Sequence, residues 1–452
     1  MRCKKVFAGG AVAAVAAVAA VVGAGAIMAT RGASASPVLF SQVVGPDPGA
    51  VALDARAGHV FVANRGNTLS MLDANDGRVL RTVTLNSAPA SLAVDTRRGP
   101  LLVDSLSFSV GAPNSVTTID TRTGSILRAT DVGQGAGAIA LDQGAGRAYV
   151  ANSQDDTMST LDLASGRTLR TVPVGFDHTT GYDPVAIAAD LRAGHIFTAN
   201  SGNNSISMFD AASGRLLRVT HLGKPMLNGR ETFGAHSLAV SETDGHLFVG
   251  GNTPYGSGGA VRTLDTRSGA VIRTVGVSWD PGEIAMDTRT GRVFVPNGAG
   301  PGLLLDARTG AVAGAIGWSS GSWSAGDGMA VDERTGLVYS LAGAAIDNTG
   351  AAVGTGRLLA FDGKTGALVR AVLVGLLPRD LALDSRTGHV FVSSLSDLEF
   401  NRYGYRTRAG GGSGPWGWVP QPIRGWLPHA PSVQPPPSGP INGAVSVIDT
   451  TR

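Results

Sequence analysis

The chain has 452 residues, of which 64 are glycine and only one, Cys3, is cysteine. Its formal net charge of +3 comes from residues 1–35, which hold four basic residues and no acid, so the remainder is close to neutral. This balance gives no indication of a nucleic-acid partner, and the position of Cys3 excludes a disulfide, a thiolate metal site and a cysteine nucleophile from residues 36–452.

Residues 1–35 have the features of an export signal. Basic residues at the start precede an apolar run, Val6–Ala29, and Ala33-Ser34-Ala35 supplies the small-x-small pattern of a cleavage site. The run is long enough to cross a bilayer if it is retained. Its alanine and glycine content favours a cleaved signal peptide over an N-terminal membrane anchor. We expect residues 36–452 to be secreted or to act in the cell envelope, with a membrane contact only through an uncleaved N-terminus.

The next predicted strand lies within Pro37–Gly49 and stands apart from any neighbouring strand in the sequence. It resembles "RVLRTVTL" at residues 78–85 and "RTLRTVPV" at residues 167–174. Each of those two segments is the last strand in a group of four. Residues 37–49 therefore look like a fourth strand without the three strands that should precede it.

The stretch Val60–Gly77, "VFVANRGNTLSMLDANDG", defines the repeating unit. Apolar and polar residues alternate within it, which is typical of strands buried on one face. One strand precedes it in "VALDARAG" and another follows in "RVLRTVTL", so the unit has four strands. Turns of the form Asp-x-x-x-Gly follow the first and third strands, because Asp can accept bonds from nearby amides and Gly can take the left-handed conformation. We interpret these aspartates as turn residues and not as calcium ligands.

Eight copies of this unit can be counted, about 41 to 52 residues apart. The first turn is marked by Asp54/Gly58, Asp95/Gly99, Asp142/Gly146, Asp190/Gly194, Ser241/Gly245, Asp287/Gly291, Asp332/Gly336 and Asp384/Gly388. This spacing predicts an all-β fold, an eight-bladed β-propeller of four-stranded blades, with seven blades as the alternative. The eighth copy reaches Asp449 without a fourth strand, so we expect residues 37–49 to supply that strand and close the ring.

Three segments carry a family resemblance: "VFVANRGNTLSMLD", "AYVANSQDDTMSTLD" and "IFTANSGNNSISMFD". They resemble the YVTN-type β-propeller repeat, a relative of the NHL repeat. The resemblance covers nearly all of residues 36–452 and implies the fold. It implies little about function, because such propellers serve as binding modules, envelope proteins and sugar-lactone hydrolases alike. The strand-end asparagine of the pattern is present at Asn64, Asn152, Asn200 and Asn297 and missing from the other copies.

Loops of variable length follow the second and fourth strands, which end on the same side of an up-and-down blade. The longest runs from Ser396 to Asn442 and is too rich in Pro and Gly for regular structure. All six tryptophans fall on this side: Trp279, Trp318, Trp323, Trp416, Trp418 and Trp426. Such a surface suits a small molecule, a glycan or a protein partner. Alternatively, the longest loop forms a lid that buries its own tryptophans.

Polar residues gather at the start of the first strand in the later copies, where a propeller has the mouth of its central channel. The first four copies have mainly small or aliphatic residues there. The later copies have His236, Glu283, Asp327, Arg379 and Asp380. We expect these side chains to converge, and His236, Glu283 and Asp327 form a ligand set for calcium or magnesium or a set for acid–base work. The alternative is a solvated polar rim.

The sequence thus indicates an exported, monomeric binding module that recognises an unidentified ligand or partner on its loop-rich face. Residues 317–321 match G-x-S-x-G, but they lie between predicted strands and lack the strand-to-helix elbow of a serine nucleophile. Four histidines, His59, His195, His246 and His389, occupy one equivalent turn position and are interpreted as structural. The second interpretation is a propeller enzyme of the lactone-hydrolase or lyase type that acts at the channel mouth.

Overall fold

The computed structural model describes residues 38–106, 114–176, 181–222, 234–252, 258–278, 281–297, 302–316, 323–346, 352–353, 356–395 and 442–450, with the backbone alone at 106, 323–327, 344–346, 352–353, 376 and 442. The chain divides into Met1–Ala35 and Ser36–Arg452, and every described residue belongs to the second unit. Within the described residues, no helix is long and apolar enough to cross a membrane.

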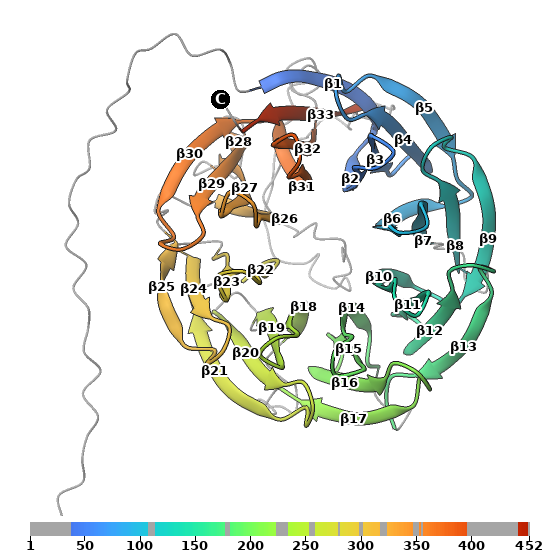
Figure 1. The fold of residues 1–452 in the computed structure, drawn as a ribbon, viewed down its shortest axis with the longest axis vertical. Coiled ribbons are helices and arrows are strands. Elements are labelled where there is room, and N and C mark those ends of the chain that lie inside the picture. Colours follow the sequence, from blue (N-terminus) through green and yellow to red (C-terminus); the bar gives the residue numbers. More distant parts are fainter. Residues whose placement is uncertain are drawn as a thin grey trace, which may run out of the picture. The chain divides into compact units, whose positions relative to one another are not determined.

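Eight antiparallel sheets surround a common centre, and each contains four strands in sequence order except where noted below (Figure 1). Blade 1 consists of β2 (Pro48–Asp54), β3 (His59–Asn64), β4 (Thr68–Asp73) and β5 (Val79–Thr84); blade 2 of β6 (Ala88–Val94), β7 (Pro100–Leu106), β8 (Asn114–Asp120) and β9 (Ile126–Val132); blade 3 of β10 (Ala136–Asp142), β11 (Arg147–Asn152), β12 (Thr157–Asp162) and β13 (Thr168–Pro173); and blade 4 of β14 (Pro184–Asp190), β15 (His195–Asn200), β16 (Ser205–Asp210) and β17 (Leu216–His221). Blade 5 consists of β18 (Gly234–Ser241), β19 (His246–Asn252), β20 (Gly259–Asp265) and β21 (Val271–Val277); blade 6 of β22 (Ala285–Asp287), β23 (Arg292–Val295), β24 (Gly302–Asp306) and β25 (Val312–Ile316); blade 7 of β26 (Trp323–Asp332), β27 (Leu337–Ile346), β29 (Arg357–Asp362) and β30 (Leu368–Leu373), with β28 (Ala352–Val353) paired to β27; and blade 8 of β31 (Leu376–Asp384), β32 (His389–Leu395), β33 (Asn442–Asp449) and β1 (Val38–Pro46).

The ring closes through β1, which is the outermost strand of blade 8. It pairs antiparallel with β33, with Phe40 opposite Val447 and Val43 opposite Ala444. The prediction of eight blades closed by an N-terminal strand is therefore confirmed, and the seven-blade alternative is wrong. Because β1 comes from the start of the chain, no hairpin joins the third and fourth strands of this blade.

The short turns have the geometry that their residues predict. Asp54 is buried, and its Oδ1 accepts hydrogen bonds from the amides of Arg56 at 3.0 Å and Ala57 at 3.1 Å. Gly58 has φ +72°, a left-handed conformation that a residue with a Cβ adopts only with strain. Its amide bonds the Asp54 carbonyl at 2.9 Å and completes the turn.

The hydrophobic core lies between the blades. The described residues form eight buried clusters, and each joins the facing sides of two neighbouring blades. The first strand of each blade lies nearest the centre (Figure 1) and is rich in alanine. Small residues suit this position, because the eight sheets come closest together there.

Four histidines make polar contacts with the following blade, all in the same direction around the ring. The Nδ1 atom of His59 in blade 1 lies 2.7 Å from the carbonyl oxygen of Thr121 in blade 2. The same contact recurs at 2.8 Å for His195 with Thr266 and at 3.4 Å for His389 with Ala74, which spans the closure. With His246 of blade 5, these histidines connect blades 1, 4, 5 and 8 to the blade that follows each, which agrees with their structural interpretation.

Candidate functional site

His236, one of the predicted channel-mouth residues, lies at a backbone irregularity that recurs in neighbouring blades. In blades 2 to 5 the first strand carries a register shift at the equivalent place, and Ala90, Gly137, Val185 and His236 are the residues left out of the ladder. Such a bulge turns the extra residue away from regular pairing. The sequence pattern therefore located a recurrent structural feature, although it did not predict the bulge itself.

The residues that follow His236 and Glu283 in the sequence are joined by a hydrogen bond between blades 5 and 6. The amide of Ile284, which follows Glu283, donates a hydrogen bond of 2.9 Å to Oγ of Ser237, which follows His236. His236 and Glu283 thus each lie next to a residue that takes part in a hydrogen bond between blades 5 and 6. Ser237 is buried, whereas Glu283 is exposed.

Asp380 has a structural contact that the sequence did not indicate. Its Oδ2 accepts a hydrogen bond from the Val51 amide of blade 1 at 2.7 Å, and its Oδ1 accepts one from the Leu381 amide at 2.8 Å. The bond to Val51 occupies the same place in its repeat as the bond between Ser237 and Ile284. We call these two bonds the inner latches. Asp380 therefore joins the closing blade to the first blade.

Arg379 faces Asp47, which precedes the first strand of blade 1. Its Nη2 lies 3.8 Å from Oδ1 of Asp47, whose Oδ2 lies 3.1 Å from Nε of Arg65. All three side chains are partly solvent-exposed, so these ion pairs contribute little to stability. Arg379 and Asp380 thus make their recorded contacts with different residues of blade 1.

The predicted metal ligand set cannot be assembled within the described side chains. Asp327 lies in β26, and only its backbone is described; the next residue, Gly328, packs against the backbone of Asp380. Among the described residues, no group of three or more His, Asp, Glu or Cys side chains is placed to hold a metal ion. A calcium or magnesium site at His236, Glu283 and Asp327 stays a prediction.

The predicted aromatic surface falls almost wholly outside the described residues. This applies to Trp279, Trp318, Trp416, Trp418 and Trp426. Trp323 begins β26, and its backbone alone is described. The choice between a ligand surface and a packed lid therefore stays open.

The strand-end asparagines have a structural role in the blades that carry the full pattern. In blade 1, Nδ2 of Asn64 donates to Oγ of Ser70 at 3.0 Å, and blades 3 and 4 repeat this bond. Blade 5 has Gly251 in place of the asparagine and Arg262 in place of the serine. Burial lowers the pKa of the Arg262 guanidinium. Arg262 lies in the same blade as His236, and sequence reasoning missed it although the departure from Ser was visible.

Asp104 is a second residue that sequence reasoning missed. It lies in β7 with 0 % exposure, where blades 1, 3 and 4 have Ala63, Ala151 and Ala199. Within the described part of the chain, neither carboxyl oxygen has a hydrogen-bond partner of standard geometry. Burial raises the pKa of Asp104 to about 8, against a smaller lowering by the Ser105 amide. The signal that could have identified Asp104 is an acidic residue at a position where the equivalent blades have alanine.

Comparisons with known proteins agree on the fold. Residues 6–220 match the family model described as "Outer membrane protein assembly factor BamB". BamB from Moraxella catarrhalis has a solved structure that is 13% identical, with a TM-score of 0.55, and the match covers 79% of this chain and 96% of that one. The computationally designed protein Ika8 is 15% identical, with a TM-score of 0.57, over 78% of this chain and 94% of that one. None of the curated protein sequences matches this chain significantly.

These matches support a repeat β-propeller and leave the YVTN type of the repeat unconfirmed. At 13% and 15% identity, the two structures share the fold and carry no evidence about chemistry. The family model matches less than half of the chain, so the match is a similarity.

Proposed function

We propose that this chain is an extracytoplasmic binding module that recognises a protein partner on its loop-bearing face. One observation carries the proposal. Segments of variable length leave the blades after second and fourth strands, which end on one face, whereas the opposite face consists of short turns of constant form. Sequence variation concentrated on one face of a repeat ring is typical of a binding surface.

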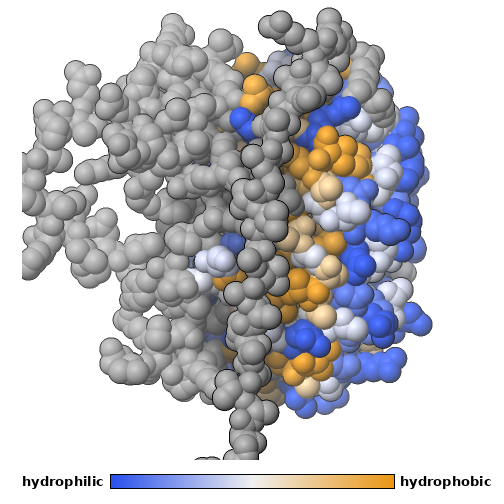
Figure 2. All heavy atoms as spheres, turned by 90° about the vertical axis from the view of Figure 1, so that its left-hand side faces the viewer, coloured by the Kyte–Doolittle hydropathy of each residue, from blue (hydrophilic) through white to orange (hydrophobic). Residues whose placement is uncertain are grey.

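The short-turn face has a different role, because its polar groups are used to join the blades. Arg56 of blade 1 donates to the carbonyl of Thr96 in blade 2 at 2.6 Å, and Arg334 of blade 7 donates to that of Ser385 in blade 8 at 2.6 Å. Figure 2 shows this face as a hydrophilic surface on the right-hand side of the view. Residues that hold neighbouring blades together are less free to change in sequence to suit a partner.

The similarity of residues 6–220 to a model named for an outer membrane protein assembly factor supports a place in the cell envelope. The export features of residues 1–35 support the same location. This support is independent of the first, because it comes from a segment outside the propeller. A protein partner is favoured over a small ligand because the named relative is an assembly factor.

A photo-crosslinking amino acid tests which face binds. Gln154 is exposed in the turn between β11 and β12 on the loop-bearing face, and Arg122 is exposed between β8 and β9 on the short-turn face. In cells that express the full chain, we expect a crosslinked protein of one mass from Gln154 and none from Arg122. Adducts from Arg122 alone would overturn the proposal.

Trp416→Ala combined with Trp418→Ala provides a second readout. If the tryptophans contact the partner, the double variant loses the Gln154 adduct and keeps the parent melting temperature. If they form a buried lid, the variant is destabilised, by up to about 3–5 kcal/mol for each buried Trp. Two of the five channel-mouth residues have contacts between blades, Asp380 with Val51 and Arg379 with Asp47, which supports a structural role for them over the enzyme interpretation.

A further inference from the structure

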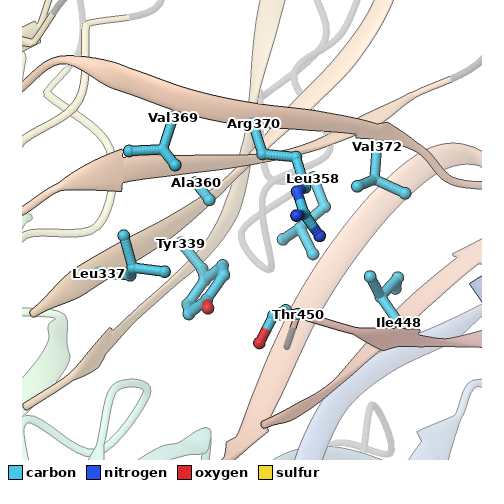
Figure 3. A pocket seen from close by; sticks show the side chains of 9 residues that line it. All are labelled: Leu337, Tyr339, Leu358, Ala360, Val369, Arg370, Val372, Ile448 and Thr450. Atoms are coloured by element: carbon cyan, nitrogen blue, oxygen red, sulfur yellow. The ribbon is translucent and has the colours of Figure 1, made fainter. Parts of the chain in front are cut away.

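A cavity of about 50 Å³ lies between blades 7 and 8, away from the loop-bearing face. It is lined by Leu337, Tyr339, Leu358, Ala360, Val369, Arg370, Val372, Ile448 and Thr450. Figure 3 shows that these residues come from β27, β29 and β30 on one side and from β33 and the residue after it on the other. The cavity therefore lies at the seam between blades 7 and 8, and none of its described lining residues comes from β1.

Other seams show what normally occupies this place. The fourth strand of a blade carries an arginine four residues after the turn glycine, and this arginine contacts the short turn of the next blade. Arg81 donates to the Thr123 carbonyl at 2.9 Å, Arg128 to that of Ala164 at 3.2 Å, and Arg273 to that of Thr309 at 2.8 Å. In each case a main-chain oxygen of the neighbouring hairpin receives the guanidinium.

Arg370 is the equivalent arginine of blade 7, and the described part of blade 8 has no such hairpin to receive it. The fourth strand of blade 8 is β1, so β33 and β1 are not connected by a turn. Among the described residues, the Arg370 guanidinium has no hydrogen-bond or ion-pair partner. In Figure 3 the guanidinium reaches between Leu358 and Val372 toward the cavity.

Tyr339 supplies a second hydrogen-bond donor. Its equivalent in blade 3, Tyr149, donates to the carbonyl of Ala211 in blade 4 at 2.9 Å. Tyr339 is 1 % exposed, and its hydroxyl completes no hydrogen bond of standard geometry within the described residues, although Thr450 lies beside it. Burial raises the pKa of Tyr339, so the hydroxyl keeps its proton and remains a donor.

The Arg370 guanidinium and the Tyr339 hydroxyl are hydrogen-bond donors in an otherwise apolar cavity, so they favour a ligand that accepts hydrogen bonds. A carboxylate has two acceptor oxygens and can serve both donors. Arginine binds carboxylates through two parallel hydrogen bonds, and a protonated phenol adds a third. At about 10–15 Å³ of such volume for each water molecule, the cavity has room for a few waters or for the end of a side chain. At the outer rim of the seam, Val369 and Leu373 are 57 % and 60 % exposed.

We propose that this seam binds an acidic side chain of a partner polypeptide. The carboxylate of a Glu or Asp enters the cavity between Arg370 and Tyr339. Apolar residues on either side of it pack on the exposed aliphatic side chains of β30. The site is separate from the loop-bearing face, so it defines a second contact surface and does not depend on the first.

The test uses the full chain and two peptides, Ac-Val-Glu-Val-NH2 and its Gln counterpart. Binding is measured by saturation-transfer NMR and titration at constant ionic strength. We expect saturable binding of the Glu peptide, and binding weaker by about tenfold or more for the Gln peptide and for Arg370→Gln. Tyr339→Phe should weaken binding less. The matched control is Arg128→Gln, whose arginine already contacts a hairpin, and it should bind like the parent.

Three results would overturn the proposal. The first is no saturable binding of the Glu peptide to the parent. The second is an Arg128→Gln variant that weakens binding as much as Arg370→Gln does. The third is binding only to a chain shortened by residues 451–452, which would make the chain's own segment the occupant. If Arg370→Gln does not fold, Arg370→Lys replaces it, because it keeps the charge and loses the two-point geometry.

Discussion

At the scale of single residues, Asp104 makes the stability of the propeller depend on pH. Its pKa is about 8 in the folded chain, whereas an unfolded aspartate titrates near 4. Between these values the folded state binds more protons than the unfolded state, so stability falls as pH rises. The contribution is fully present below about pH 4 and is lost as the pH passes through about 8.

Asp104→Asn should remove this dependence. The amide cannot ionise, so relative to the parent the variant should gain stability between pH 4 and pH 8, by about 1.4 kcal/mol for each pH unit, with the smallest difference near pH 4. Urea denaturation at several pH values measures it. Asp162→Asn is a control of opposite sign, since the Ser165 amide and hydroxyl lower the pKa of that exposed turn residue. Parallel curves for the parent and Asp104→Asn between pH 5 and 9 would contradict the prediction.

Variants of Asp380 distinguish a structural role for this residue from a catalytic one. Asp380→Ala leaves the Val51 amide without its acceptor and should cost about 1–3 kcal/mol, measured by chemical denaturation. Asp380→Asn keeps an acceptor oxygen and should cost less. Ser237→Ala is the matched variant, because it removes the other inner latch. Unchanged stability in both alanine variants would mean that the inner latches do not hold the blades.

At the scale of secondary-structure elements, β1 carries the closure of the ring. Phe40 packs with the cluster between blades 8 and 1, and a Cβ at Gly77 would overlap its ring. Val43 lies on the same strand but is 45 % exposed. Phe40→Ala should therefore destabilise the protein by up to about 3 kcal/mol, whereas Val43→Ala should change stability by no more than about 0.5 kcal/mol. Melting curves of the two variants provide the comparison.

Deletion of Val38–Pro46 is the stronger version of this experiment. It exposes the edge of β33 and the apolar residues that β1 covers, so we expect aggregation or a sharply lower melting temperature. A deleted chain that melts like the parent would contradict the closing role of β1.

The sequence predicted the strands well because the turns repeat. Asp54 and Gly58, with their equivalents, mark the same hairpin in every copy, and the structure has a turn at each of them. The bulges were not predicted, since a displaced register leaves no local pattern. Asp380 was interpreted as a channel residue because its partner, Val51, lies 329 residues away in the sequence. The variable loops have no repeat from which contacts can be inferred.

At the scale of the whole molecule, the later blades are the ones on which a cation would be bound. If His236, Glu283 and Asp327 bind calcium or magnesium, the ion should stabilise the folded state, by about 2.7 kcal/mol at a hundredfold excess over the dissociation constant. Glu283→Gln should abolish that increase in melting temperature. Asp76→Asn, an exposed change on the short-turn face, should retain it. If the melting temperature is the same with calcium, with magnesium and with a chelator, the three residues form a solvated polar rim and not a cation site.

Export gives a prediction for the complete chain. If residues 1–35 are a cleaved signal peptide, the mature protein should begin at Ser36, directly after Ala33-Ser34-Ala35. N-terminal sequencing of the protein recovered from outside the cytoplasm measures this. Material that begins at Met1 would instead support a membrane anchor.

The pairing of β1 with β33 also determines when folding can finish. Of the described strands, β1 is synthesised first and β33 last, so the two cannot pair while synthesis or transport is under way. Each intermediate blade can pack on its predecessor, but blade 8 must wait for both ends of the chain. Closing so long a loop costs entropy before its contacts are gained, which makes the last step slow. Until then β1 is an unpaired apolar strand, and a chaperone that shields it should raise the yield of folded protein more than one that binds any middle blade.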